Sequence, residues 1–164
     1  MEGRIFLNKI LPLLIILSFL KGIFSQIVPY LPFDFYSALF LSLIPFLNIN
    51  LFSFLSLFFL ALLKSLDSPY TSFIFIILYF VFFIGFQQLQ KNFKTETRFF
   101  RFLFWGISFF CLLVIEIYIF FNNLSLTSLD YLFWFHFLLK IILYFGLSLL
   151  FCIFFHYFFR KIIN

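Results

Sequence analysis

Three ionisable side chains stand inside long apolar segments, where a charge is costly. Glu116 lies in CLLVIEIYIF, and Lys140 lies in FHFLLKIILYF with His136 one helical turn before it. A charge at the centre of a membrane helix costs about 2.5–3.5 kcal/mol on insertion scales. Counted from the ends of their segments, Glu116 and Lys140 lie at similar depths. We therefore predict an interhelical ion pair between them, with His136 on the same face as Lys140.

Two kinds of chemistry would use such a group. Ionisable residues within membrane helices can form a ligand pocket or a proton relay. The same residues can also form a neutralised pair that joins two helices, or a polar contact with a partner protein. A relay normally needs more titratable groups along a path than these segments offer, so the structural interpretations are favoured.

The segments that hold these residues belong to a chain with very little polar surface. Of the 164 residues, 65% are hydrophobic and 10% are charged, and the mean hydropathy is +1.19. A typical soluble domain has about 45–50% apolar and about 25% charged residues. The composition therefore predicts an all-α, polytopic membrane protein in a single domain. The net charge is +5, and the basic residues lie at the ends of apolar runs. This placement is typical of residues that set membrane topology rather than of a nucleic-acid-binding surface.

Apolar runs of about 20 residues predict membrane-spanning helices, and the chain offers about six candidate helices. They cover approximately residues 5–24, 33–47, 50–63, 73–89, 99–121 and 131–159. The apolar stretch that contains the second and third is too long for one ordinary span. Pro45, Asn48 and Asn50 favour two short helices with a turn at the asparagines. A single long kinked helix is the alternative.

The distribution of basic residues orients these helices. If the N-terminus is cytoplasmic and six helices cross, the cytoplasmic segments hold Arg4, Lys9, Lys91, Lys94, Arg98, Arg101, Arg160 and Lys161. The outer segments hold only Lys21 and Lys64. This bias follows the positive-inside rule and predicts that both termini are cytoplasmic.

The same count defines a basic cytoplasmic loop, made of Lys91, Lys94, Arg98 and Arg101. Such a loop could contact anionic lipids or a cytoplasmic partner. We predict that His156 lies beside Arg160 at the interface between the membrane and the cytoplasm.

Sequence motifs of enzymes are missing from the chain. It has no glycine-rich phosphate loop, no paired His/Glu metal motif and no nucleophile elbow. We therefore expect no enzymatic activity, no cofactor, and no catalytic or metal-binding residues. Cys111 and Cys152 lie in apolar segments and are interpreted as small hydrophobic residues. No G-x-x-x-G dimerisation motif is present, and a homodimer is left open.

A short polar interruption, LKSLDSPYTS, joins the third and fourth predicted helices. Asp67 and Ser68 come directly before Pro69, a residue that is tolerated in the first turn of a helix. This order predicts a side-chain-capped turn that leads into a helix.

Three stretches of the chain resemble the family of rod shape-determining proteins MreD, chiefly over residues 30–120. The first is YLPFDFYSALFLSL, where Asp34 takes the acidic place in the family's Pro-Asp lead into an apolar helix. The second is LFFLALLKSLDSPYTSFIFIILYFVFFIGFQ, a helix, a short polar turn and a helix. The third is KNFKTETRFFRFLFW, a basic loop before the helix that contains Glu116. The second stretch departs from the pattern, because Lys64 stands near the family's acidic place.

The resemblance implies a non-enzymatic scaffold subunit of the bacterial inner membrane, serving cell elongation and lateral peptidoglycan synthesis. Its implied partners are MreC and, through the complex, the actin-like MreB and peptidoglycan synthases. The alternative is a substrate-binding membrane subunit of an energy-coupling vitamin transporter, which has a similar size and helix number. Its pocket would have to use Glu116, Lys140, His136 and Asp67. The bulky first helix, LPLLIILSFLKG, favours the scaffold.

Overall fold

The computed structural model describes residue 9 and residues 11–27, 34–67, 73–93, 97–122 and 131–163. Within these ranges the chain forms six α-helices and no strand. The helices are α2 (Leu11–Ile27), α3 (Phe35–Leu43), α4 (Leu51–Asp67), α5 (Phe73–Asn92), α6 (Arg98–Asn122) and α7 (Tyr131–Ile163). A single 3₁₀ turn, η2 (Ile44–Phe46), follows α3 in this part of the chain. The predicted all-α class is confirmed for the described residues.

Three of these helices are long and apolar enough to cross a membrane, judged by length and composition. The qualifying segments are Phe73–Asn92, Arg98–Tyr118 and Trp134–Ile162. Shorter apolar helices cover Leu11–Ile23, Phe35–Phe46 and Leu51–Leu66. A helix rises about 1.5 Å per residue, and the hydrocarbon core of a bilayer is about 30 Å thick. As a helix, the segment Phe35–Phe46 is therefore shorter than the hydrocarbon core is thick, and it needs the longer helices around it to be covered within a bilayer.

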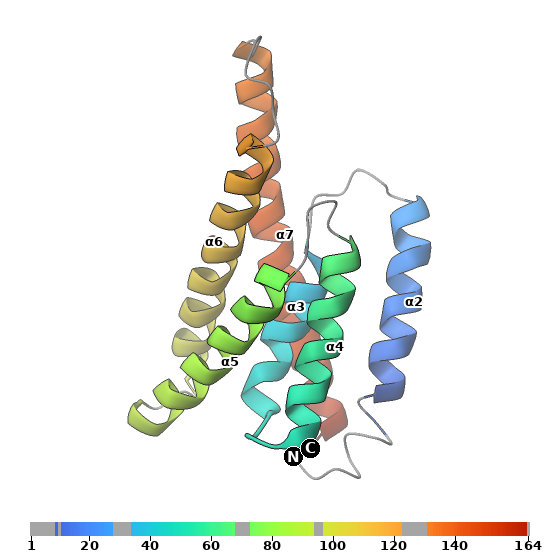
Figure 1. The fold of residues 1–164 in the computed structure, drawn as a ribbon, viewed down its shortest axis with the longest axis vertical. Helices are drawn as coiled ribbons and strands as arrows, with labels where there is room; N and C mark the ends of the chain where they lie inside the picture. Colours follow the sequence, from blue (N-terminus) through green and yellow to red (C-terminus); the bar gives the residue numbers. More distant parts are fainter. Residues whose placement is uncertain are drawn as a thin grey trace.

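Successive helices run in alternating directions along one axis (Figure 1). In this view α2, α4 and α6 run upward, and α3, α5 and α7 run downward. The helices α6 and α7 pack side by side and extend beyond the others at the upper end. We call the lower end the basic end, because it carries Lys91, Arg98, Arg101, Arg160 and Lys161.

The short helix α3 lies at the centre of the bundle. All nine of its residues are buried, and it packs against α4, α6 and α7 (Figure 1). An aromatic pair joins it to α5, because Phe40 stacks on Tyr79 with ring centroids 4.0 Å apart. A helix that is apolar nearly all round needs neighbours or lipid on every side, and here neighbouring helices supply them.

The chain reverses between α3 and α4, at residues 47–50. Asn50 ends the turn, and its side-chain oxygen accepts the backbone N–H of Ser53 at 2.8 Å. This is the hydrogen bond of a helix N-cap. The apolar stretch around the turn therefore forms two helices rather than one kinked helix. The second of them continues beyond its predicted end at residue 63, so Lys64 belongs to the last turn of α4.

The other end of α3 is held by side chains of the surrounding helices. The last carbonyl groups of a helix have no partner within it. The indole N–H of Trp105 on α6 donates to the carbonyl of Leu41 at 3.0 Å. Nδ1 of His156 on α7 faces the carbonyl oxygen of Ser42 at 3.5 Å. His156 lies near the basic end beside Arg160, as predicted, but it is buried and packs against α3 rather than facing outward.

Candidate functional site

Asp34 begins α3 in the interior of the bundle. Its backbone is extended, with φ −95° and ψ 91°, and its side chain accepts the backbone N–H of Ser37 at 3.0 Å. The backbone N–H of Asp34 donates to the hydroxyl of Ser148 on α7 at 2.9 Å. An N-cap satisfies donors that a helix leaves open at its start. The buried start of α3 is therefore hydrogen-bonded without water.

Lys64 places one ammonium group between two carboxylates. Its Nζ lies 2.8 Å from Oδ2 of Asp34 and 2.6 Å from Oε1 of Glu116 on α6. Its side chain is 9% exposed, whereas those of Asp34 and Glu116 are 1% and 29% exposed. The ring of Phe75 on α5 lies 5.1 Å from the same ammonium, within the range of a cation–π contact. We call Asp34, Lys64 and Glu116 the ion cluster.

Hydroxyl groups complete the surroundings of Asp34. The hydroxyl of Ser37 donates to Oδ2 of Asp34 and lies 2.7 Å from the hydroxyl of Tyr79. The hydroxyl of Tyr144 on α7 donates to Oδ2 of Asp34 at 3.0 Å. Hydrogen bonds to a carboxylate supply part of the solvation that burial removes. Together, α3, α4, α5, α6 and α7 all contribute polar groups to this one region.

The arrangement favours a structural cross-link over a proton relay. A relay across a membrane needs titratable groups that open to both sides. The connected groups end at Tyr79, which is fully buried. The partly exposed members, Glu116 and Tyr144, are each bonded to one member of the Asp34–Lys64 pair. The cluster can neutralise charge and fix the relative positions of helices.

The predicted partner of Glu116 is wrong. The structure pairs Glu116 with Lys64, while Lys140 and His136 lie on exposed parts of α7. The position of α7 explains the difference, because it is Tyr144, one turn further along, that reaches the ion cluster. The prediction measures depth from the ends of the apolar runs, but α7 extends beyond α6 at the upper end (Figure 1). The ends of these runs therefore do not mark a common level.

The remaining predicted residues lie in different parts of the chain. Asp34 lies in the ion cluster, whereas Asp67 is the final residue of α4, and no side-chain position is described for it. Pro69 and Lys94 lie outside the described residues. Lys91 lies in the last turn of α5. The first turn of α6 carries Arg98 and Arg101, so these three basic residues share the basic end.

Several polar residues of the site were not singled out from the sequence. They are Ser37, Tyr79, Tyr144 and Ser148, and Lys64 was assigned to an outer loop. Two spacings in the sequence carry a signal for them. Ser37 follows Asp34 by three residues, the spacing of an N-cap hydrogen bond. Tyr144 and Ser148 are four residues apart, which places them on one face of a helix.

The fold and site together define a class: an all-helical protein with membrane-length apolar helices and an ion cluster inside its bundle. No family model, no curated protein and no solved structure matches this chain. No group of three or more His, Cys, Asp or Glu side chains that could hold a metal ion occurs within the described ranges. Both cysteines are free thiols, Cys111 half-buried and Cys152 buried.

Proposed function

We propose that this protein is a non-enzymatic scaffold subunit of the bacterial inner membrane, of the MreD kind, which binds MreC in the cell-elongation machinery. One observation carries the proposal. Asp34 and Lys64 lie in two of the three stretches that resemble the family, and Glu116 lies on the helix into which the third stretch leads. The three side chains meet in one ion cluster, although Lys64 itself departs from the family's pattern. The resembling stretches therefore form a common structural unit rather than three unrelated likenesses.

The distribution of polar groups supports a scaffold. The ionic groups of the bundle interior bind one another, while large apolar side chains cover the outside of several helices. Examples are Phe19 on α2, Ile77 on α5 and Ile142 on α7, all more than half exposed. Surfaces of this kind face lipid or the helices of a partner. MreC would be bound through such helix faces, and MreB and the peptidoglycan synthases would be joined through the complex.

The proposed topology has six membrane passages with both termini in the cytoplasm. The basic end would then face the cytoplasm, in agreement with the positive-inside rule. Of the two lysines assigned to outer segments, Lys64 is used inside the bundle, so the charge bias becomes stronger. The short α3 would enter from the outer side as part of a hairpin with α4, enclosed by the longer helices.

Partner identification tests this proposal. The tagged full chain is purified from native membranes in a mild detergent after cross-linking, and the recovered proteins are identified by mass spectrometry. We expect MreC and peptidoglycan synthases. Recovery of an energy-coupling membrane subunit with paired ATPases would instead establish the vitamin-transporter alternative and overturn the scaffold.

A matched pair of variants relates recovery to the ion cluster. Lys64→Met removes the ammonium that serves both carboxylates, whereas Lys140→Met removes an exposed ammonium from α7. We expect the first variant to lose its partners and the second to keep them. Equal recovery with both variants, at equal protein level, would contradict the role of the cluster in assembling the scaffold.

A further inference from the structure

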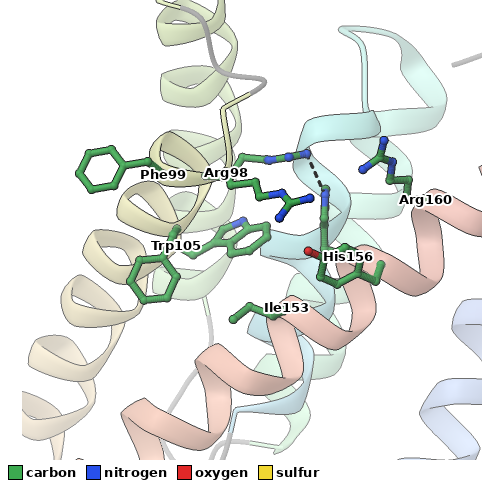
Figure 2. A pocket seen from close by; sticks show the side chains of 9 residues that line it. Arg98, Phe99, Trp105, Ile153, His156 and Arg160 are labelled. Atoms are coloured by element: carbon green, nitrogen blue, oxygen red, sulfur yellow. Dashed lines mark hydrogen bonds between the residues drawn. The ribbon is translucent and has the colours of Figure 1, made fainter.

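A cavity opens at the basic end, between the first turns of α6 and the last turns of α7. Its volume is about 330 Å³, and three arginines line it: Arg98 and Arg101 from α6, and Arg160 from α7. None of the described residues that line it is acidic. In Figure 2 the dashed line marks the hydrogen bond between Arg101 on α6 and His156 on α7, and Arg160 lies on the other side of the histidine in this view.

His156 forms the floor of this cavity and fixes the position of the Arg101 side chain. Its Nε2 lies 2.9 Å from Nη1 of Arg101, and its Nδ1 faces the carbonyl oxygen of Ser42. A guanidinium can only donate, so Nε2 accepts and Nδ1 carries the proton that points to the carbonyl. The ring also packs against Phe46 and Trp105, with centroids 5.0 and 5.2 Å away. Arg101 is thus positioned before any ligand arrives.

The lining chemistry selects an anion with several oxygen atoms. A guanidinium presents a rigid fork of N–H donors that matches phosphate oxygens. Three such groups around one cavity favour a phosphate over a single carboxylate. Trp105, whose indole N–H is bonded to Leu41, contributes an apolar wall instead of another donor.

The apolar side of the cavity identifies the source of the phosphate. Phe99 and Phe102 line the cavity on α6 and are 76% and 50% exposed. Ile107 and Phe110 continue the exposed apolar surface along the same membrane-length helix. In a bilayer this surface contacts acyl chains, while the arginines lie at the level of the headgroups. A ligand that joins a phosphate to acyl chains fits both parts.

We propose that the cavity between α6 and α7 binds the phosphate headgroup of an anionic phospholipid, with its acyl chains along the exposed aromatic side of α6. This inference depends on a membrane around the long helices and not on the scaffold role. Its failure would therefore leave the proposed function untouched.

The test uses the purified full chain in a neutral detergent. Short-chain phosphatidylglycerol is titrated by calorimetry, in parallel with short-chain phosphatidylcholine and with inorganic phosphate. We expect phosphatidylglycerol to bind at least about tenfold more tightly than either comparison ligand. Inorganic phosphate binding as tightly as phosphatidylglycerol would overturn the lipid assignment in favour of a soluble anion, and equal binding of phosphatidylcholine would overturn the selection of an anionic lipid.

Two double variants with the same loss of charge separate the cavity from general electrostatic attraction. Arg98→Gln with Arg160→Gln removes two cavity arginines, and neither side chain forms a hydrogen bond to another residue of the described part of the chain. Lys91→Gln with Lys161→Gln removes two exposed charges at the same end, outside the cavity.

We expect the arginine variant to bind phosphatidylglycerol at least about tenfold more weakly, since charge-assisted hydrogen bonds to phosphate are lost. The lysine variant should stay within about twofold of the original protein, since the cavity that it leaves intact supplies most of the affinity. Equal weakening in both would overturn the proposal, as would no weakening in the first. The single variants Arg98→Gln and Arg160→Gln provide the same comparison if the double variant does not fold.

Discussion

Lys64 supplies the one positive charge of the ion cluster. Its ammonium is the shared partner of Asp34 and Glu116, at 2.8 and 2.6 Å. Removing one partner from a buried ion pair leaves an uncompensated charge, which costs more than the pair itself contributes. Here the loss would expose two carboxylates to each other in the interior of the bundle. The cluster therefore depends on Lys64 more than on either acid.

Substitution of Lys64 by Met should destabilise the protein strongly. We expect a loss of about 3–5 kcal/mol in the free energy of unfolding, because the buried carboxylate of Asp34 and the half-buried one of Glu116 lose their counter-ion. The measurement is unfolding in mixed micelles with increasing denaturing detergent. Lys140→Met is the control, and it should stay within about 0.5 kcal/mol because its side chain is exposed. Equal loss in both variants would contradict the assignment of the stabilising counter-ion to Lys64.

The site was predictable from the sequence only as far as individual residue types allow. Glu116 within an apolar helix indicates a polar partner, and the structure contains one. The identity of that partner depends on the vertical offset between helices, which apolar runs do not encode. Lys64 lies close to Asp67 and Pro69 in the sequence, so it was assigned to the loop. The extra turn of α4 moves it into the bundle.

At the level of elements, α3 is a short helix with both ends satisfied by side chains. Its start uses Asp34 and the hydroxyl of Ser148. Its carbonyl end uses Trp105 and His156. In a bilayer, backbone groups without a partner cost several kcal/mol each, so irregular or short segments persist only where protein satisfies them. The surrounding helices thus replace the water that would otherwise solvate the ends of α3.

Substitution of Trp105 by Phe should weaken the carbonyl end of α3. The change removes the N–H that binds the buried carbonyl of Leu41, for which we expect a loss of about 1–3 kcal/mol in the free energy of unfolding. Trp134→Phe is the matched control, since Trp134 is 43% exposed on α7. It should change the stability by no more than about 0.5 kcal/mol. The same detergent titration measures both, and equal effects would show that the Leu41 hydrogen bond contributes nothing.

The helices differ in how far the sequence specifies them. Asn48 and Asn50 mark the reversal between α3 and α4, because their side chains suit turns and caps. The enclosure of α3 could not be predicted in this way. An apolar helix surrounded by protein and one surrounded by lipid have the same composition, so the pattern of FYSALFLSL does not distinguish them. Whether protein or lipid surrounds α3 depends on how the helices that follow it in the chain pack.

At the level of the whole molecule, alternating helix directions bring basic residues from separate segments to one end (Figure 1). A hydrogen bond from Lys9 to the carbonyl of Ile162, at 3.1 Å, joins the start of the described chain to the end of α7 there. In a membrane with an anionic inner surface, this end has the lower energy on the cytoplasmic side.

Accessibility of a cysteine at position 48 tests the proposed orientation. Asn48 is exposed in the turn between α3 and α4. In a background with Cys111→Ala and Cys152→Ala, we expect Asn48→Cys to react with a membrane-impermeant maleimide in inverted vesicles and not in intact cells. Phe93→Cys, exposed after α5 at the basic end, should label on the same side. Labelling of Asn48→Cys in intact cells would contradict six passages with cytoplasmic termini.

Because α7 helps to enclose α3, the environment of α3 is complete only after α7 has been synthesised. Ribosomes deliver the helices from α2 to α7, yet α3 needs Ser148 and His156 from α7 at its two ends. Until α7 has entered the bilayer, a nascent α3 has polar ends that neither lipid nor the earlier helices satisfy. The chain must therefore keep α3 near the translocon or at the membrane surface while roughly a hundred further residues are made.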